Sequence, residues 1–391
     1  MTILGIYLLN QIRTGGNRKY LEIVEGLASR GVTVFVIMNS FLDYTPVNFI
    51  KIELPIKYGQ HKFPPASFLF KKNVKENIRQ IEEFISGYIN TSVDFILSFG
   101  DTHLKSALFL RKIFKAPLFY GFRANDIDRA HILRAYGGMS LLEYLFSILY
   151  EPINRYREKQ VARNAELISF LNNSDKNRFI ERTGCSESKI TVIPNHIGLP
   201  RCTPEFKNKN HSEEVKNIVY VGSLSADKGL WDLLKAIAIL KKDGYTKPHY
   251  YMLGRPENIN PTLNLIKELD IEELISIEGY KDPFPYFAKY DLFIYPSLYD
   301  SFGNVVTESL HTGCPVIASS VGGITDILSY PELLFKSGDF QEIADKIELC
   351  IKDKDHYHKI RQLCSERAEK YYFDWAERYE NAMKAYKLKV D

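Results

Sequence analysis

The chain has 391 residues, 45% of them hydrophobic and 25% charged, with a formal net charge of +3, which suits a soluble globular protein of two domains of about 150 to 200 residues each. Its five cysteines are odd in number and include no CxxC pair, which argues against a disulfide framework or a zinc site and favours a reducing cytoplasm. No run reaches the length of about 20 apolar residues that spans a bilayer.

Positive charge is concentrated in the first half of the chain. Residues 1–195 hold 26 Lys and Arg against 18 Asp and Glu, whereas the remainder holds 25 against 30. A basic surface attracts anions, so we expect this half to face an anionic membrane surface or lipid carrier. The protein is then cytoplasmic, or peripheral on the inner face of the cell membrane.

The chain opens with an apolar strand and a pair of glycines. Residues 3–9 are continuously apolar, which is typical of a strand buried on both faces of a parallel sheet. Gly15 and Gly16 follow, and a helix to about Arg30 leads to the second strand. Paired glycines at a strand-to-helix turn allow an anionic group to approach the backbone; a plain tight turn is the alternative.

Two segments of the first half are candidates for membrane contact. In residues 57–75, basic residues alternate with aromatic ones, as in a loop that dips rings into a membrane interface; the alternative is a loop with inward rings and solvated lysines. Residues 141–150 (LLEYLFSILY) are also apolar. A run this short is usually core, so we interpret it as a buried helix of the first domain.

Polar residues follow two further strands of the first half. Loops at the carboxyl ends of parallel strands line the ligand crevice, so His103, Arg123 and Asp126 could face a reacting centre. We interpret His103 as an ordinary loop histidine. Asp126 and Asp128 form a DxD pair, but nothing around it suggests a metal site, and we predict no metal.

Domain boundaries are read from composition. Pro200, Pro204 and the polar residues up to Lys216 form the best interdomain linker. We predict a first domain over residues 1–198, a linker over 199–216, a second domain over 217–372 and a final helix over 373–391.

The second domain begins with a strand and the turn SLSADKGL, before a helix from Leu230 to Lys242. Lys228 stands at the start of this helix, where the helix dipole disfavours a cation unless an anion binds beside it. The position therefore favours a phosphate next to Lys228; a solvated lysine at the start of the helix is the alternative.

The stretch from Tyr295 to Gly323 is a βαβ unit with two carboxylates at its mouth. Asp300 lies in the loop, and Glu308 lies about two turns further along on the helix. A helix that begins just after Gly303 offers unpaired backbone N–H groups to a phosphate. The carboxylates are then free to bind hydroxyl groups of the ligand. A ligand with a phosphate beside several hydroxyl groups is a nucleotide sugar.

The order of residues in this stretch, PSxxDSFGxxxxES followed by GxPVIAS and VGG, resembles the donor-site signature of glycosyltransferase family 4 (glycosyl transferases group 1). The resemblance covers nearly the whole chain and is strongest over residues 217–330. It implies an α/β protein of the GT-B fold, with two Rossmann-like domains facing across a cleft and a C-terminal helix that crosses back to the N-terminal domain. The second domain would bind the donor and the first the acceptor.

The resemblance also implies an activity. The chain is expected to be a retaining, metal-independent hexosyltransferase without a cofactor, which moves a sugar from a UDP- or GDP-linked donor to a saccharide or lipid-linked acceptor in cell-surface polysaccharide or glycolipid synthesis. Nucleic acid is not an expected partner. Two alternatives share the fold: a nucleotide-sugar epimerase, and a partner subunit that has lost turnover.

By the same resemblance, Lys228 and the paired glycines meet the donor diphosphate, Asp300 holds a sugar hydroxyl and Glu308 the ribose. The chain departs from the family where Ser223 replaces an arginine and Asp300 a glutamate; Arg255 is the nearest replacement for that arginine. The predicted catalytic residues are Arg123, Asp126, Lys228 and Asp300, and the predicted donor-binding residues are Gly15, Gly16, Ser223, Lys228, Arg255, Tyr280, Lys281, Asp300, Ser301, Phe302, Gly303, Asn304 and Glu308.

Overall fold

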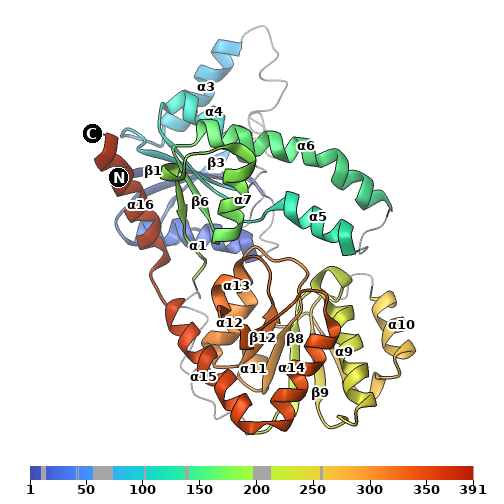
Figure 1. The fold of residues 1–391 in the computed structure, drawn as a ribbon. Coiled ribbons are helices and arrows are strands. Elements are labelled where there is room, and N and C mark those ends of the chain that lie inside the picture. Colours follow the sequence, from blue (N-terminus) through green and yellow to red (C-terminus); the bar gives the residue numbers. More distant parts are fainter. Residues whose placement is uncertain are drawn as a thin grey trace. The chain divides into compact units, whose positions relative to one another are not determined.

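The computed structural model describes residues 1–9, 15–40, 42, 44–55, 74–100, 103–136, 141–196, 213–255 and 259–390. The chain forms two compact units (Figure 1). Unit 1 comprises Met1–Asn125, Tyr150–Pro194 and Asp374–Asp391, and unit 2 comprises Asp126–Leu149 and Asn195–Phe373. Most of the predicted linker and of the aromatic and basic segment 57–75 lies outside the described residues.

Unit 1 is built on a parallel sheet, which in the described residues has seven strands in the order β3-β2-β1-β4-β5-β6-β7. All residues of β1, β4, β5 and β6 are buried, as continuous apolar runs predict for a parallel sheet covered on both faces. The strands are β1 (Thr2–Tyr7), β2 (Thr33–Asn39), β3 (Ile50–Leu54), β4 (Phe95–Phe99), β5 (Leu118–Gly121), β6 (Leu167–Phe170) and β7 (Ile190–Val192).

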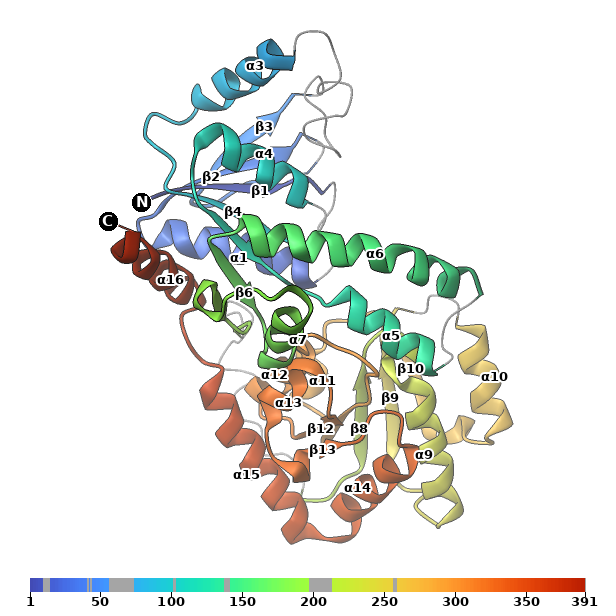
Figure 2. The same cartoon turned by 45° about the horizontal axis from the view of Figure 1, so that its top comes forward.

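The C-terminal helix α16 (Trp375–Val390) belongs to unit 1 and packs against α1 (Gly15–Ser29), and both ribbon views show the two side by side (Figures 1 and 2). Arg30, just after α1, donates to the Asp374 carboxylate at 2.6 Å and to the Glu380 carboxylate at 2.7 Å. The last helix therefore returns to the first unit, as expected for the fold. The other helices of this unit are α3 (Val74–Ser86), α4 (Leu104–Phe114), the second half of α6 (Leu141–Asn164), α7 (Asn173–Thr183) and the 3-10 turn η3 (Glu187–Lys189).

Unit 2 contains a second parallel sheet, whose six described strands have the order β10-β9-β8-β11-β12-β13. The chain proceeds outward from β8 to β10 and then returns to β11 on the other side of β8. The loops after β8 and β11 therefore diverge at a topological switch point, where open α/β sheets bind ligands. The strands are β8 (Asn217–Val221), β9 (His249–Leu253), β10 (Ile275–Gly279), β11 (Leu292–Tyr295), β12 (Val316–Ser319) and β13 (Leu334–Phe335).

Helices of unit 2 pack in pairs, α9 on α14, α14 on α15 and α12 on α15 (Figure 2). None of the described helices is long and apolar enough to cross a membrane. The helices and 3-10 turns are α5 (Asp126–Tyr136), the first half of α6, η5 (Ala226–Lys228), α9 (Leu230–Lys242), α10 (Asn260–Glu268), η6 (Glu272–Leu274), α11 (Phe284–Phe287), α12 (Asn304–Thr312), α13 (Gly322–Leu328), η7 (Pro331–Leu333), α14 (Phe340–Lys352) and α15 (Lys354–Lys370).

The division into units differs from the predicted domain boundaries at Asp126–Leu149, which the sequence assigned to the first domain. Helix α5 lies in this segment, and its last residue contacts another part of unit 2. The Tyr136 hydroxyl donates to the Ser337 carbonyl at 2.6 Å. A Cβ on Gly338 would lie 2.3 Å from the Tyr136 ring, so glycine allows this close contact.

The apolar run at residues 141–150 forms a helix but is not buried, so the prediction of a core helix is wrong. Every residue of the run is exposed except the half-buried Ser147. The run is the beginning of α6, whose buried residues are Glu158 and Val161. Because the helix has 24 residues, it extends well beyond the part of it that meets the core.

Candidate functional site

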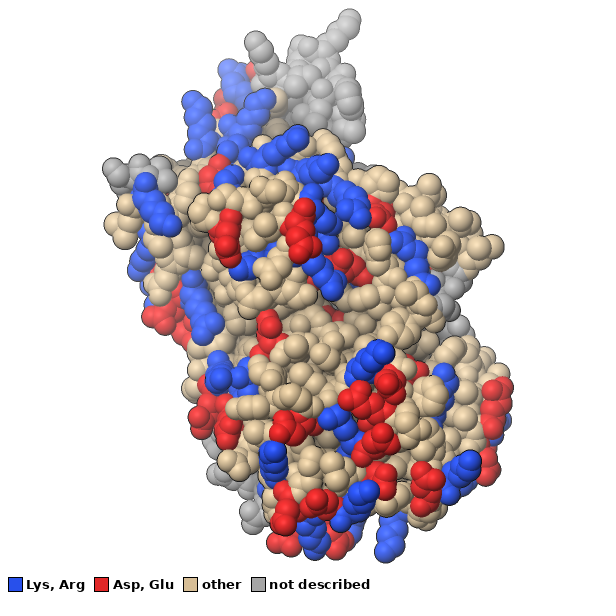
Figure 3. Space-filling view, in the orientation of Figure 1, with Lys and Arg blue, Asp and Glu red and all other residues tan. Residues whose placement is uncertain are grey.

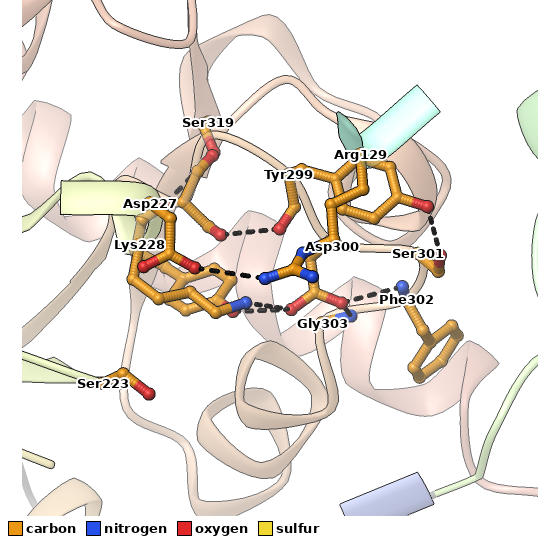
Figure 4. A network of polar contacts seen from close by, with 12 residues as sticks. Arg129, Ser223, Asp227, Lys228, Tyr299, Asp300, Ser301, Phe302, Gly303 and Ser319 are labelled. Carbon is orange, nitrogen blue, oxygen red and sulfur yellow. Dashed lines mark hydrogen bonds and ion pairs between the residues drawn. The ribbon is translucent and has the colours of Figure 1, made fainter. Parts of the chain in front are cut away.

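The loops after β8 and β11 pack closely together at a glycine. Gly229 has a φ of +68°, and a Cβ there would lie 1.8 Å from the carbonyl oxygen of Pro296. Only glycine allows both this left-handed backbone and this contact. The close approach places Lys228 beside the second loop, where its Nζ lies 3.6 Å from Oδ2 of Asp300 (Figure 4).

The carboxylate of Asp300 accepts hydrogen bonds from the loop that precedes α12 (Figure 4). Its Oδ1 accepts the backbone N–H groups of Phe302 at 3.0 Å and Gly303 at 2.9 Å. Its Oδ2 accepts the Tyr295 hydroxyl at 2.6 Å. Burial opposes ionisation, but the Lys228 ammonium, the Tyr295 hydroxyl and the two N–H groups together hold the pKa of this carboxyl below its usual value. Asp300 is therefore an anion at neutral pH.

Gly322 and Gly323 pack closely against the same loop. Gly322 has a φ of +45°, and a Cβ there would lie 2.1 Å from the carbonyl oxygen of Asp300. A Cβ on Gly323 would lie 2.6 Å from the carbonyl oxygen of Ser301. The VGG segment therefore serves the close packing of α13 against the Asp300 loop.

The neighbouring predicted residues take different positions around α12. Asn304, its first residue, accepts a hydrogen bond from the Asn195 amide at 2.8 Å. Ser301 is buried and shares a hydrogen bond of 2.6 Å with the Tyr299 hydroxyl. Glu308 is half-buried in the middle of the helix. Because the N–H of Gly303 already donates to Asp300, a phosphate bound by that N–H would have to replace the carboxylate.

Arg129, on α5, reaches the Lys228 loop and is absent from the residues that the sequence singled out. Its Nη2 lies 3.7 Å from Oδ2 of Asp227, the residue before Lys228. Figure 4 shows the guanidinium pointing into the group formed by Asp227, Lys228 and Asp300. No local pattern points to this contact, because α5 comes from the half of the chain that was assigned to the other domain.

Three predicted donor-binding residues follow β9 and β10. The Arg255 guanidinium lies over the Tyr280 ring, 5.0 Å from its centroid, as in a cation–π contact. The Lys281 ammonium lies 2.6 Å from the Glu278 carboxylate, which raises the pKa of Lys281. Ser223 is exposed. It lies two residues after the end of β8, so these residues all stand near the carboxyl ends of neighbouring strands.

In unit 1, Arg123 is held by aromatic side chains. Its guanidinium lies 4.3 Å from the centroid of Phe99 and 5.4 Å from that of Trp375, and it donates to the Tyr379 hydroxyl at 3.4 Å. Two of these three residues belong to α16, so Arg123 connects β5 to the C-terminal helix.

The remaining sequence candidates have simpler surroundings. Gly15 and Gly16 are the first residues of α1, and Asp126 is exposed at the start of α5. His103 is buried next to Tyr7, and burial lowers the pKa of its imidazole to about 4. It is therefore neutral at pH 7. No cluster of three or more His, Cys, Asp or Glu residues that could hold a metal occurs in the described parts of the chain.

Part of unit 2 is similar to a known protein family. Residues 203–370 match the family model Glycosyl transferases group 1. The matched range covers less than half of the chain. The matched range contains the Lys228 and Asp300 loops and the whole of α12.

Curated relatives match part of the chain. The capsular polysaccharide biosynthesis glycosyltransferase CapM of Staphylococcus aureus is 29% identical over 201 residues, which cover 47% of this chain and 52% of CapM. The N-acetylgalactosamine-N,N'-diacetylbacillosaminyl-diphospho-undecaprenol 4-alpha-N-acetylgalactosaminyltransferase of Campylobacter jejuni is 27% identical over 168 residues, 43% of this chain and 45% of the relative. The chain thus spans about half the length of these relatives.

Solved structures match over nearly the full length. Sucrose-phosphate synthase from Thermosynechococcus elongatus superposes with a TM-score of 0.73 at 18% identity, covering 98% of each chain. Anabaena HepE in complex with UDP and glucose superposes with a TM-score of 0.71 at 17% identity, covering 98% of this chain and 99% of HepE. These likenesses and the two parallel sheets confirm the predicted GT-B fold.

Proposed function

We propose that the chain is a retaining glycosyltransferase that moves a hexosyl unit from a UDP- or GDP-linked sugar to a saccharide or lipid-linked acceptor, in cell-surface polysaccharide or glycolipid synthesis. One observation carries the proposal: Lys228 and Asp300 meet, 3.6 Å apart, where the loops after β8 and β11 come together. Nucleotides bind to α/β sheets at such switch points. The role named for CapM, and the HepE complexes with UDP and with UDP-glucose, support this chemistry.

Two cations would bind the donor diphosphate, Lys228 and Arg129. Each now faces one carboxylate, Asp300 and Asp227 respectively, and a diphosphate would offer them additional negative charge. When the bond between the sugar C1 and the diphosphate oxygen breaks, its electron pair stays on that oxygen, and cations fixed beside it lower the barrier. In this proposal Arg129 supplies the second cation, for which the family has an arginine at the position of Ser223.

The other groups would position the sugar and the nucleotide. The ionised Asp300 has acceptor capacity left for a sugar hydroxyl, and Glu308 would accept the ribose hydroxyls. The acceptor oxygen bonds to C1 on the face that the diphosphate leaves, and the leaving phosphate oxygen takes the acceptor proton, so no protein base and no metal are required. Arg123 would assist the charge separation, and Asp126, Gly15 and Gly16 remain predicted site residues.

A lipid-linked acceptor implies that the sugar is transferred at a membrane surface. The excess of Lys and Arg in residues 1–195 would favour the anionic inner face of the cell membrane. We therefore propose a peripheral location on that face.

Calorimetric titration of the full chain with UDP- and GDP-sugars tests the activity. A transferase binds one of these donors and releases the nucleotide quickly only when an acceptor is present. Conversion of a UDP-sugar without any acceptor would identify an epimerase instead. Failure to bind any nucleotide sugar would identify a subunit that has lost turnover.

The role of Arg129 is tested with Arg129→Gln. Loss of a charge-assisted hydrogen bond of about 1.5–3 kcal/mol should weaken UDP binding by about 10- to 100-fold. Uridine lacks the diphosphate, so its affinity should not change. Arg134→Gln, on the same helix, is the matched control. Equal weakening of UDP and uridine, or no weakening, would place Arg129 outside the phosphate site.

A further inference from the structure

The beginning of α6, Leu141–Tyr150, is the most exposed apolar segment in the described parts of the chain, and we call it the apolar end of α6. In Figure 3 it lies at the right-hand edge of the upper half, where the surface is largely tan. A soluble protein seldom leaves so many large apolar side chains in water without a use for them. The exposed ones, with the fraction exposed, are Leu141 75%, Leu142 68%, Tyr144 41%, Leu145 48%, Phe146 56%, Ile148 45%, Leu149 67% and Tyr150 51%.

The apolar side chains surround the helix instead of forming a stripe. Successive residues of an α-helix point about 100° apart, so Tyr144, Leu145 and Phe146 already face three directions, and all three are exposed. Glu143 is the only charged residue of the ten. A folded partner, or a second copy of this chain, covers one face of a helix and needs an apolar stripe. A helix that is apolar on all sides matches an occupant that surrounds it, such as the acyl chains of a lipid layer.

The second half of the same helix carries positive charge. Residues 151–164 hold four basic residues and two acidic ones. One of the acidic residues, Glu158, is neutralised by Arg182, with N–O distances of 2.7 and 2.8 Å. Lys159 and Arg163 are exposed. The helix therefore changes along its length from apolar to basic, which complements acyl chains followed by anionic headgroups.

We propose that the apolar end of α6 inserts into the boundary between the headgroups and the acyl chains of a membrane, with the basic half of α6 on anionic lipid headgroups. Ten helical residues measure about 15 Å, half of the roughly 30 Å apolar core of a bilayer, so the segment can enter one leaflet but cannot cross the membrane. Tyr144, Tyr150 and Tyr156 are exposed and suit the interface, where tyrosine is enriched. This proposal rests on the peripheral location proposed above and names the surface through which the protein would contact the membrane.

Flotation of the full chain with vesicles tests the proposal. The protein should bind vesicles of phosphatidylcholine and phosphatidylglycerol (3:1), and the double variant Leu145→Glu/Phe146→Glu should lower this binding by more than tenfold. Leu388→Glu, a leucine 84% exposed at the end of α16, is the matched control and should not change it. Lys159→Gln/Arg163→Gln should reduce the preference for anionic over pure phosphatidylcholine vesicles.

A fluorescent reporter locates the contact directly. In Phe146→Trp, the new indole should shift its emission to the blue and be quenched by brominated lipid when vesicles are added. The two native tryptophans are the half-buried Trp231 and the buried Trp375, and the wild-type chain, which has only these two, is the control that should not respond. Absence of flotation, flotation unaffected by the double variant, or a blue shift that depends on protein concentration without vesicles, as in self-association, would overturn the proposal.

UDP binding separates this proposal from the proposed function. The double variant should keep the wild-type thermal stabilisation by UDP or GDP, whichever the wild type binds, which shows that it is folded. Vesicle binding by a chain that binds no nucleotide would contradict the transferase and leave the membrane contact standing. Nucleotide binding without vesicle binding would contradict the membrane contact and leave the proposed transferase standing.

Discussion

Replacing Lys228 by alanine should slow sugar transfer by more than a hundredfold, about 2.7 kcal/mol of barrier. The ammonium lies 3.6 Å from Asp300 in a half-buried position, so it acts where water screens little. Its charge matters most when the diphosphate leaves, and kcat should therefore fall more than KM rises. Turnover can be measured as release of nucleotide diphosphate under saturating donor and acceptor.

Two controls keep this result interpretable. Lys235→Ala removes a lysine of α9 that lies 3.9 Å from Asp232 and is 43% exposed, and such surface pairs contribute little. It should leave turnover unchanged. In Lys228→Ala, Asp300 keeps the Tyr295 hydroxyl and two N–H groups, so the melting temperature should change little. Turnover within threefold of wild type would remove Lys228 from the diphosphate site.

The sequence predicted the parts of the fold that depend on local pattern. Continuous apolar runs such as residues 3–9 predicted buried parallel strands, and β1 is buried throughout. The loop with Asp300 and the helix after Gly303 were also predicted, since strand, glycine turn and helix are adjacent in the chain. Adjacency along the chain is what a single sequence reports well.

Contacts between distant segments were not predicted. Arg129 and Asp227 are 98 positions apart, and no local pattern connects them, although they lie 3.7 Å apart. The bonds of Asp300 to its own loop were missed for a different reason: a short carboxylate can bind a ligand or cap a turn, and the sequence does not distinguish the two. The roles assigned to Arg123, Asp300 and Glu308 stay predictions.

Helix α6 shows why burial cannot be read from hydrophobicity alone. A stripe of apolar residues tells which face of a helix is buried, but a helix apolar on all sides suits either a protein interior or a lipid layer. Residues 141–150 carry no stripe, so their length decided the interpretation in favour of the core. The structure shows all of them except Ser147 exposed, so the interpretation as core is wrong and hydrophobicity alone did not reveal it.

Replacing Gly229 by alanine should destabilise unit 2 by about 2–4 kcal/mol and abolish nucleotide binding. The left-handed backbone strains any other residue by about 1 kcal/mol, and the new Cβ would lie 1.8 Å from the Pro296 carbonyl oxygen and 3.1 Å from its Cβ. Relief of this overlap must separate the loops after β8 and β11, with a cost typical of overpacking, about 1–3 kcal/mol. Urea unfolding and UDP titration measure the two effects.

Gly244→Ala isolates the contribution of backbone strain. Gly244 also has a positive φ, +90°, but a Cβ there would meet nothing within 4 Å. It follows α9 at the end away from Lys228, so this variant should lose about 1 kcal/mol and bind UDP normally. The difference between the two variants measures the contact between the loops. If Gly229→Ala bound UDP as Gly244→Ala does, close packing of the two loops would not be what builds the nucleotide site.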